Sequence, residues 1–300
     1  MRIAGTIVRT PLVRLQLQHD GPAEIYLKLE NLQPIGSFKL RGAGNALAFA
    51  DPGELAEGLW TASAGNMAQA VAWHARERGL PSTAVVPDTA PETKLEAIER
   101  FGAEVVKVPP ETWFEVFRTR SHPGMKGFFV HAFSDPAVMA GNGTIGLEIL
   151  EDLPDADEVL IPFGGGGLSS GIAAALRALA PDCKVYACEV ETAAPLAASL
   201  AAGEPVEIEH TPSFVDGIGG PRVFPEMFAR ASELLDGSLV VGLDEVAASV
   251  RLLVERNRIV AEGAGATPVA AALKRPGGKI VCVVSGGNID TPTLRGILEG

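Results

Sequence analysis

A chain of 300 residues, 47% of them hydrophobic, can build one large or two medium-sized domains with substantial buried cores. Its net charge of −12 argues against nucleic acid or an anionic membrane surface as a partner, because both repel an acidic protein. No apolar run approaches membrane-spanning length and the N-terminus lacks a signal-like stretch, so we expect no membrane span and a cytoplasmic protein.

Apolar runs bounded by glycine and proline alternate with helix-like stretches, which is typical of an α/β fold with largely parallel sheets. An apolar strand precedes Lys39 and a helix of small residues follows it. Further along, we predict strands at 83–86, 104–108, 127–131, 158–162, 184–188 and 279–284. We predict helices at 67–78, 92–101, 168–179 and 243–258. The polar, proline-marked stretch 202–222 is expected to be a long surface excursion.

Three cysteines, Cys183, Cys188 and Cys282, lie in or beside these apolar runs. Their spacing is unlike that of metal ligands, and three is an odd number for a disulfide framework. We therefore expect small core residues in a reducing compartment.

Lys39 closes a tight turn, Gly36-Ser37-Phe38-Lys39, between the first predicted strand and helix. A lysine amine can form a Schiff base with a carbonyl cofactor. A lysine at a helix start is more often a solvated residue, but two further motifs favour the chemical role.

The first motif is a run of four glycines, Gly164, Gly165, Gly166 and Gly167, between a predicted strand and the helix that begins at Leu168. Glycines allow successive N–H groups to point inward, and the helix N-terminus adds partial positive charge. A tight strand–helix turn usually needs only one or two glycines, so four favour a phosphate site. The run lacks the Gly-Lys-Ser/Thr ending and the Gly-x-Gly-x-x-Gly spacing of nucleotide sites.

The second motif, Ser285-Gly286-Gly287-Asn288, follows the last buried strand, and ligands gather at the carboxyl ends of parallel strands. A neutral hydroxyl facing a pyridine nitrogen would leave that nitrogen mostly unprotonated. Lys39, the glycine run and Ser285 thus supply an attachment point, a phosphate cradle and a ring-nitrogen partner, as pyridoxal phosphate requires. A further turn, Ser63-Ala64-Gly65-Asn66, opens a helix and suits either a plain N-cap or a carboxylate site.

These blocks, in this order, resemble the fold-type II pyridoxal-phosphate enzymes, in the branch of serine/threonine dehydratases (threonine ammonia-lyases) and serine racemases. The resemblance extends from Arg9-Thr10-Pro11-Leu12 to Ser285–Asp290, nearly the whole chain. It implies a two-lobed α/β fold like that of the tryptophan synthase β-subunit, with parallel-rich sheets flanked by helices. A large cofactor-binding domain would comprise 1–47 plus 136–300, and a small mobile domain, 48–135, would close over the site. A homodimer is also implied.

The resemblance assigns roles to individual residues. Lys39 would bind pyridoxal 5'-phosphate covalently, with Phe38 packed beside the ring. Asn66 would hydrogen-bond the phenolic oxygen of the cofactor, and Ser285 would face its pyridine nitrogen. The phosphate would be held by Gly164, Gly165, Gly166, Gly167 and Leu168. The amino-acid substrate would be bound by Ser63, Ala64, Gly65, Asn66, Met67 and Gly217.

Three positions depart from the family pattern. Met67 stands where relatives usually have histidine, which leaves the substrate preference open. Ala64 stands where racemases carry serine, and alanine cannot act as the second acid/base that racemisation needs. Relatives that bind a divalent cation use a glutamate, a backbone carbonyl and an aspartate. Glu189 and Ala193 match the first two, but Pro195 replaces the aspartate, so we expect no metal site or a weak one.

The predicted function is elimination from a 3-hydroxy amino acid of the L-threonine or L-serine type, giving a 2-oxo acid and ammonia. Three alternatives remain on the same cofactor: racemisation, β-replacement, and elimination from a bulkier or acidic substrate such as phenylserine or hydroxyaspartate. The surroundings of Lys39 and Asn66 look unlike the sulfhydrylase version of the fold, which disfavours replacement. A cofactor-binding protein without efficient catalysis is a fourth possibility. No C-terminal regulatory domain is expected.

Overall fold

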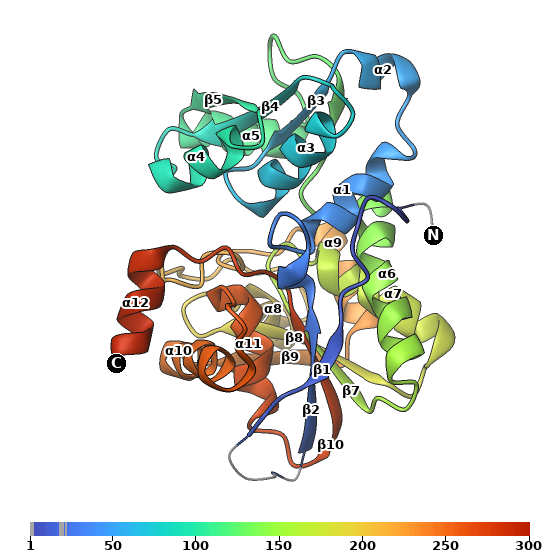
Figure 1. The fold of residues 1–300 in the computed structure, drawn as a ribbon, viewed down its shortest axis with the longest axis vertical. Helices are drawn as coiled ribbons and strands as arrows, with labels where there is room; N and C mark the ends of the chain where they lie inside the picture. Colours follow the sequence, from blue (N-terminus) through green and yellow to red (C-terminus); the bar gives the residue numbers. More distant parts are fainter. Residues whose placement is uncertain (1–2, 18–20, 22) are drawn as a thin grey trace. The chain divides into compact units, whose positions relative to one another are not determined.

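The computed structural model describes residues 3–17, 21 and 23–300, and the chain divides into two compact units (Figure 1). The smaller unit comprises Lys39–Gly141 and a short N-terminal segment that ends at Val8. The larger unit comprises Arg9–Phe38 and Asn142–Gly300. Both units are α/β structures, as the alternating sequence pattern predicts.

The larger unit contains a six-stranded sheet with the order β1-β2-β10-β7-β8-β9. The strands are Leu12–Arg14 (β1), Ala23–Leu29 (β2), Glu158–Pro162 (β7), Lys184–Val190 (β8), Gly237–Val241 (β9) and Gly278–Val284 (β10). Neighbouring strands run parallel, except that β1 is antiparallel to β2. The blue β2 and the red β10, from opposite ends of the chain, pair side by side in Figure 1.

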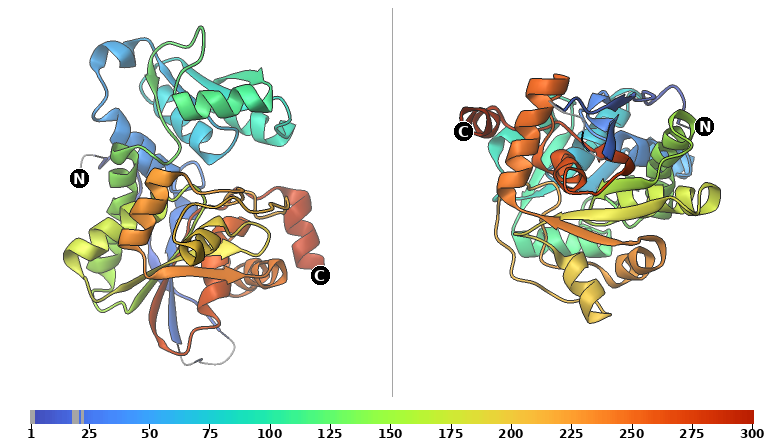
Figure 2. Two further views of the ribbon diagram at one scale, coloured as in Figure 1. Left: turned by 180° about the vertical axis from the view of Figure 1, so that it is seen from behind. Right: turned by 90° about the horizontal axis from the view of Figure 1, so that it is seen from below.

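Helices cover both faces of this sheet, and its central strands are therefore buried on both sides (Figure 2). In β10, Ile280 and Cys282 face a core shared with α10 and α11, whereas Val281 and Val283 face a core shared with α6 and α7. The longer helices are α6 (Pro136–Asp152), α7 (Gly167–Leu179), α8 (Pro195–Ala202), α9 (Pro225–Leu234), α10 (Leu243–Leu252), α11 (Gly263–Ala272) and α12 (Thr291–Glu299). No helix in the described ranges combines the length and apolarity that a membrane span needs.

The smaller unit contains a four-stranded parallel sheet with the order β5-β4-β3-β6. Its strands are Leu59–Ala62 (β3), Ser82–Pro87 (β4), Glu104–Val108 (β5) and Phe128–Phe129 (β6). Its helices are α1 (Lys39–Leu47), α2 (Pro52–Ala56), α3 (Asn66–Arg76), α4 (Glu92–Glu99) and α5 (Pro110–Thr119). Alanines of α3 pack against β4 and α4 in a small core, which explains why the helix is rich in small residues.

The predicted strands are all present, although β6 is only two residues long. The helix predicted at 243–258 ends earlier as an α-helix, at Leu252, and continues as one π-helical turn, Leu253–Asn257. Asn257 at the end of this turn hydrogen-bonds the backbone carbonyl of Arg14 (3.0 Å) and accepts the N–H of Gln16 (3.1 Å). The π-helical turn therefore ends in a contact with a segment far away in the sequence. The helical periodicity of the sequence does not reveal such a contact.

The two units divide at other residues than the expected boundaries at 47/48 and 135/136. Helix α1 belongs to the smaller unit because it packs on α3. The buried His74 of α3 donates from Nε2 to the carbonyl of Leu40 at 2.9 Å, and a Cβ at Gly44 would come within 2.9 Å of the same ring. Gly141 lies against the backbone of Arg41, and this contact holds the start of α6 to the smaller unit.

Candidate active site

Two of the predicted motifs meet at one edge of the larger sheet. Strand β7 leads into the four glycines and strand β10 leads into Ser285. These strands are parallel neighbours, with Cys282 of β10 in register with Leu160 of β7. Their carboxyl ends therefore lie side by side, at the edge where ligands bind in open α/β sheets.

The glycine loop has the backbone geometry that a phosphate cradle needs. Gly166 caps α7 with φ of +84°, a conformation that glycine adopts without strain. A Cβ at Gly164 would lie 3.2 Å from the Cα of Ile218 and 3.3 Å from the carbonyl oxygen of Gly217. The intrahelical bonds begin with Ser170, which donates to Gly166 at 2.9 Å, so the preceding first-turn amides can donate to an anion.

The segment that leads to Lys39 is hydrogen-bonded to the Ser285 block. The N–H of Phe38 donates to the carbonyl of Ser285, and the N–H of Gly287 donates to the carbonyl of Gly36, both at 2.9 Å. The Phe38 side chain packs against the core beneath α6 and α7, where Leu168 is buried. Lys39 is the next residue in the chain and begins α1.

Buried polar atoms near these loops have unused hydrogen-bonding capacity. Among the described residues, the hydroxyls of Ser37 and Ser170 are buried and have no protein partner. Asn142 donates to the carbonyl of Gly167 at 3.2 Å, while its own side-chain oxygen is buried without a partner. Unsatisfied buried groups are costly, and these three atoms are available to hydrogen-bond a bound polar molecule. The glycine cradle, the helix N-terminus and the two hydroxyls fit a phosphorylated cofactor.

The smaller unit carries the predicted carboxylate turn at the end of β3. The N–H of Gly65 donates to Oγ of Ser63 at 3.2 Å, and α3 begins at Asn66 without a side-chain cap. A Cβ at Gly65 would meet no atom within 4 Å, so the turn has open space above it. Uncapped first-turn amides beside open space suit a carboxylate.

Two of the three residues that depart from the family pattern, Met67 and Ala64, differ in their surroundings. Met67 is only 1% exposed and lies in the first turn of α3. Ala64 packs against the small core of α3, β4 and α4. Neither side chain offers a group that can transfer a proton.

Lys39 is held within the smaller unit. Its Nζ donates to the backbone carbonyl of Ala132 at 2.7 Å. The predicted site residues thus fall into two sets. Lys39 and the Ser63–Met67 turn belong to the smaller unit. Phe38, the glycine loop with Leu168, Gly217 and Ser285 belong to the larger unit.

Glu189, expected as a remnant of a cation site, caps a helix instead. It is fully buried, and its carboxylate accepts the N–H groups of Leu196 and Ala197, both at 2.8 Å, at the start of α8. The hydroxyl of Ser238 donates a third bond at 2.6 Å. Burial raises the pKa of Glu189, and these hydrogen bonds oppose the rise. Pro195 is the first residue of α8, a position that needs no N–H donor.

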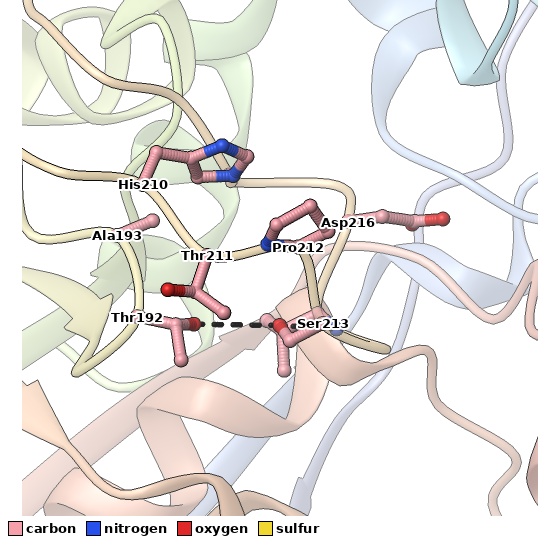
Figure 3. Close-up of a pocket in the computed structure, with 9 residues that line it drawn as sticks. Thr192, Ala193, His210, Thr211, Pro212, Ser213 and Asp216 are labelled. Atoms are coloured by element: carbon pink, nitrogen blue, oxygen red, sulfur yellow. Dashed lines mark hydrogen bonds between the residues drawn. The ribbon is translucent and has the colours of Figure 1, made fainter. Parts of the chain in front are cut away.

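Ala193 lines a cavity of about 120 Å³ between residues 192–193 and the excursion 210–219 (Figure 3). The hydroxyl of Thr192 donates to that of Ser213 at 3.4 Å, and the Asp216 side chain points away from His210. No group of three His, Cys, Asp or Glu residues in the described chain is arranged to hold a metal ion.

Glu262 lies against two glycines of the candidate site and was not among the residues predicted from the sequence. Its carboxylate lies between two glycines of the site, 2.5 Å from where a Cβ of Gly286 would be and 3.5 Å from where a Cβ of Gly217 would be. Its N–H donates to the carbonyl of Gly286 at 3.0 Å. The available signal was a single acid inside the small-residue run Ile259–Ala272 at the start of a buried helix.

Comparison with known proteins decides the family. The model of the family described as "Pyridoxal-phosphate dependent enzyme" matches residues 3–286. The chain belongs to this family. Its cofactor is pyridoxal phosphate, and its fold is the fold-type II architecture expected from the sequence.

Individual members of the pyridoxal-phosphate dependent family resemble the chain over most of its length. It is 41% identical to the L-threonine ammonia-lyase of Thermotoga maritima over 92% of this chain and 70% of that protein. The processed threonine deaminase isoform 2 of Solanum lycopersicum superposes with a TM-score of 0.88 at 33% identity, covering 98% of this chain and 88% of that one. Maize serine racemase superposes with a TM-score of 0.89 at 30% identity, covering 99% of this chain and 94% of that one.

Proposed function

We propose that this protein is a pyridoxal-phosphate-dependent ammonia-lyase that acts on L-threonine or L-serine. The substrate loses its Cα proton and its β-hydroxyl, the elements of water, and hydrolysis then releases ammonia and a 2-oxo acid. When bound, the cofactor supplies an electron sink for the negative charge that develops at Cα.

The residues of the chain divide the work between binding and proton transfer. Lys39 would hold the cofactor covalently, and its free amine would be the base that takes the Cα proton of the substrate. The amides of Gly164–Leu168 would bind the phosphate, and Ser285 would meet the pyridine nitrogen as a neutral hydroxyl. The turn Ser63–Met67 would receive the substrate carboxylate, Asn66 would meet the phenolic oxygen, and Gly217 would line the substrate side.

The attachment of the Lys39 segment to the Ser285 block is the observation that carries this proposal. The 2.9 Å bond from Phe38 to Ser285 ties the residue before the lysine to the ring-nitrogen motif, and β7 delivers the phosphate loop to the same sheet edge. The segment that precedes the lysine, the phosphate loop and Ser285 therefore lie at one edge of one sheet, within the larger unit.

Ala64 favours elimination over racemisation. Racemisation requires a second acid/base on the cofactor face opposite the lysine, and alanine has no proton to exchange. Ala64 instead packs as an apolar residue against the core of the smaller unit. Racemisation is kept as the second candidate because the fold is also close to that of maize serine racemase.

The test is release of 2-oxo acid by the cofactor-loaded protein from L- and D-threonine, L- and D-serine, phenylserine and hydroxyaspartate. We expect release from L-threonine or L-serine, and none from a Lys39→Ala variant. Chiral analysis of recovered serine runs in parallel. Conversion of L- to D-serine without 2-oxo acid would identify a racemase, and turnover by Lys39→Ala would refute the role of the lysine.

We also propose that the protein is a cytoplasmic homodimer without a divalent-cation site. The three cysteines are buried thiols, which suits a reducing compartment. The oxygens of Glu189 are occupied by amide and hydroxyl donors, which leaves them poorly placed for a cation. Sedimentation analysis tests the dimer, and elemental analysis tests the metal content.

A further inference from the structure

A buried histidine is hydrogen-bonded to the peptide group whose carbonyl meets the Lys39 amine. Ala132, whose carbonyl accepts from Lys39, is flanked by His131 and Phe133. His131 is 2% exposed, and none of the roles proposed above uses it. All of these residues belong to the smaller unit.

The Ala132–Phe133 peptide bond connects the imidazole to the lysine. Nδ1 of His131 accepts the N–H of Phe133 at 3.2 Å and that of Ser134 at 3.0 Å. The peptide bond is trans and planar, so its N–H and its C=O point in opposite directions. Because the N–H points to the imidazole, the carbonyl of Ala132 points the other way, toward the Lys39 amine.

The surroundings keep this imidazole neutral and fix its proton. Burial, together with the positive charges of Arg120 and Lys39, lowers the pKa of His131 to about 3. Nδ1 accepts two N–H groups and so carries no proton, which leaves Nε2–H to donate to the backbone of Phe117.

The ring itself is fixed by packing. Its centroid lies 4.5 Å from that of Phe117 and 5.0 Å from that of Phe133. Arg120 donates to the hydroxyl of Ser134 at 3.1 Å, and that hydroxyl also contacts Nδ1 at 3.1 Å. The turn 131–134 is therefore built around a ring that cannot rotate without breaking several contacts.

We propose that His131 is a positioning residue for Lys39: its unprotonated Nδ1 orients the Ala132 carbonyl, and this carbonyl fixes the Lys39 amine whenever the amine is not bonded to the cofactor. The carbonyl binds one N–H of Lys39, so that after the ammonium group loses a proton the lone pair of the neutral amine is available for attack or proton transfer. The inference rests on the proposed role of Lys39 but not on the identity of the substrate.

Two variants of His131 distinguish the role of Nδ1 as an acceptor from the role of Nε2–H as a donor. In His131→Asn the side-chain oxygen can replace Nδ1 as the acceptor, whereas in His131→Gln the side-chain NH₂ can replace Nε2–H as the donor. The full-length protein is stripped of cofactor, and the rate at which it captures pyridoxal phosphate, with loss of water, is followed by absorbance. Pyridoxamine phosphate is the control ligand. It lacks the aldehyde and cannot react with Lys39, so its affinity depends only on contacts with the phosphate and the ring.

We expect His131→Gln to slow capture of pyridoxal phosphate about tenfold, the effect of one misdirected hydrogen bond, and to leave the affinity for pyridoxamine phosphate unchanged. His131→Asn should stay within about twofold of the wild type for both ligands. Equal losses for both ligands, wild-type capture by His131→Gln, or equally slow capture by both variants would each overturn the proposal.

Nitrogen NMR of the wild-type protein provides a test that does not depend on the variants folding. The proposal requires an unprotonated Nδ1 on His131 with and without cofactor, and a proton on Nδ1 would refute it. None of these measurements requires turnover. A failure to eliminate from threonine or serine would therefore count against the proposed function and leave this inference standing.

Discussion

Ala64 is the residue at which we expect elimination and racemisation to separate. We expect Ala64→Ser to form D-serine from L-serine and to raise the ratio of racemisation to elimination at least about tenfold, because the hydroxyl supplies the missing acid/base. Chiral chromatography of serine, with 2-oxo acid release measured on the same sample, gives this ratio. Ala64→Val, which adds bulk without a proton, is the control. Similar ratios in both variants would contradict this assignment.

Glu262 shows that local sequence motifs do not reveal every residue near the candidate site. Lys39, the glycine run and Ser285 could be proposed from the sequence because each belongs to a local motif whose chemistry is visible in consecutive residues. Glu262 reaches the same region only because Gly286 and Gly217 leave room for its carboxylate. That contact joins three segments far apart in the chain, so no local pattern encodes it. The contact of Lys39 with Ala132 was missed for the same reason.

The N-terminus of α7 depends on the left-handed conformation of Gly166. We expect Gly166→Ala to weaken pyridoxal phosphate binding about tenfold, because a Cβ at φ of +84° is strained by about 1 kcal/mol and would lie 3.1 Å from the Phe163 ring. Equilibrium dialysis measures the affinity. Gly203→Ala is the matched control: it has φ of +77° at the end of α8, but its Cβ would meet nothing within 4 Å. Equal affinities in the two variants would refute the cradle.

Helix α8 depends on Glu189 for its N-terminal cap. We expect Glu189→Ala to lower the free energy of unfolding by about 3 kcal/mol, because two amides and the Ser238 hydroxyl lose a buried acceptor. Urea denaturation measures the change. The control is Glu191→Ala, which removes an exposed carboxylate from the N–H of Leu243 at the start of α10 and should cost about 1 kcal/mol. Stabilisation of the wild type by Mg²⁺ or Ca²⁺ that disappears in Glu189→Ala would instead identify a cation ligand.

Most strands were predictable as elements, because a buried parallel strand is a short apolar run bounded by glycine or proline. Strand β10, at Gly278–Val284, matches its predicted range to within one residue. Strand β9, Gly237–Val241, was not predicted, because it is half-exposed and its sequence is weakly apolar. The π turn at Leu253–Asn257 was also missed, since Asn257 bonds residues that are more than 240 positions away.

At the scale of the whole molecule, length and composition allowed one large or two medium-sized domains but did not locate a boundary. No linker of distinct composition separates them, and the chain passes between the units at Val8, Phe38 and Gly141. Packing defines these points: α1 joins the smaller unit through the hydrogen bond between His74 and Leu40. Such a boundary depends on contacts across the sequence, which hydrophobic periodicity does not report.

The smaller unit buries two neutral histidines, and this makes its stability depend on pH. Burial lowers the pKa of His74 to about 4, with the neighbouring Arg78 adding to the effect, and lowers that of His131 to about 3. An unfolded histidine titrates near 6.5. Between these values the unfolded chain binds protons that the folded unit cannot, so stability is complete above pH 6.5 and falls as the pH drops toward 4.

We therefore expect acid to open the smaller unit before the larger one. At pH 5 each buried histidine should lower the free energy of unfolding by about 2 kcal/mol relative to pH 7. This value follows because pH 5 lies about 1.5 units below the pKa of an unfolded histidine, and each unit corresponds to about 1.36 kcal/mol. In the described part of the larger unit the histidine is His210, which is exposed and lines a surface cavity. Hydrogen exchange, corrected for its intrinsic pH dependence, should therefore show protection falling between pH 7 and pH 5 in Lys39–Gly141 but not in Asn142–Gly300. His131→Asn should remove about half of this pH dependence, and equal loss of protection in both units would contradict the assignment.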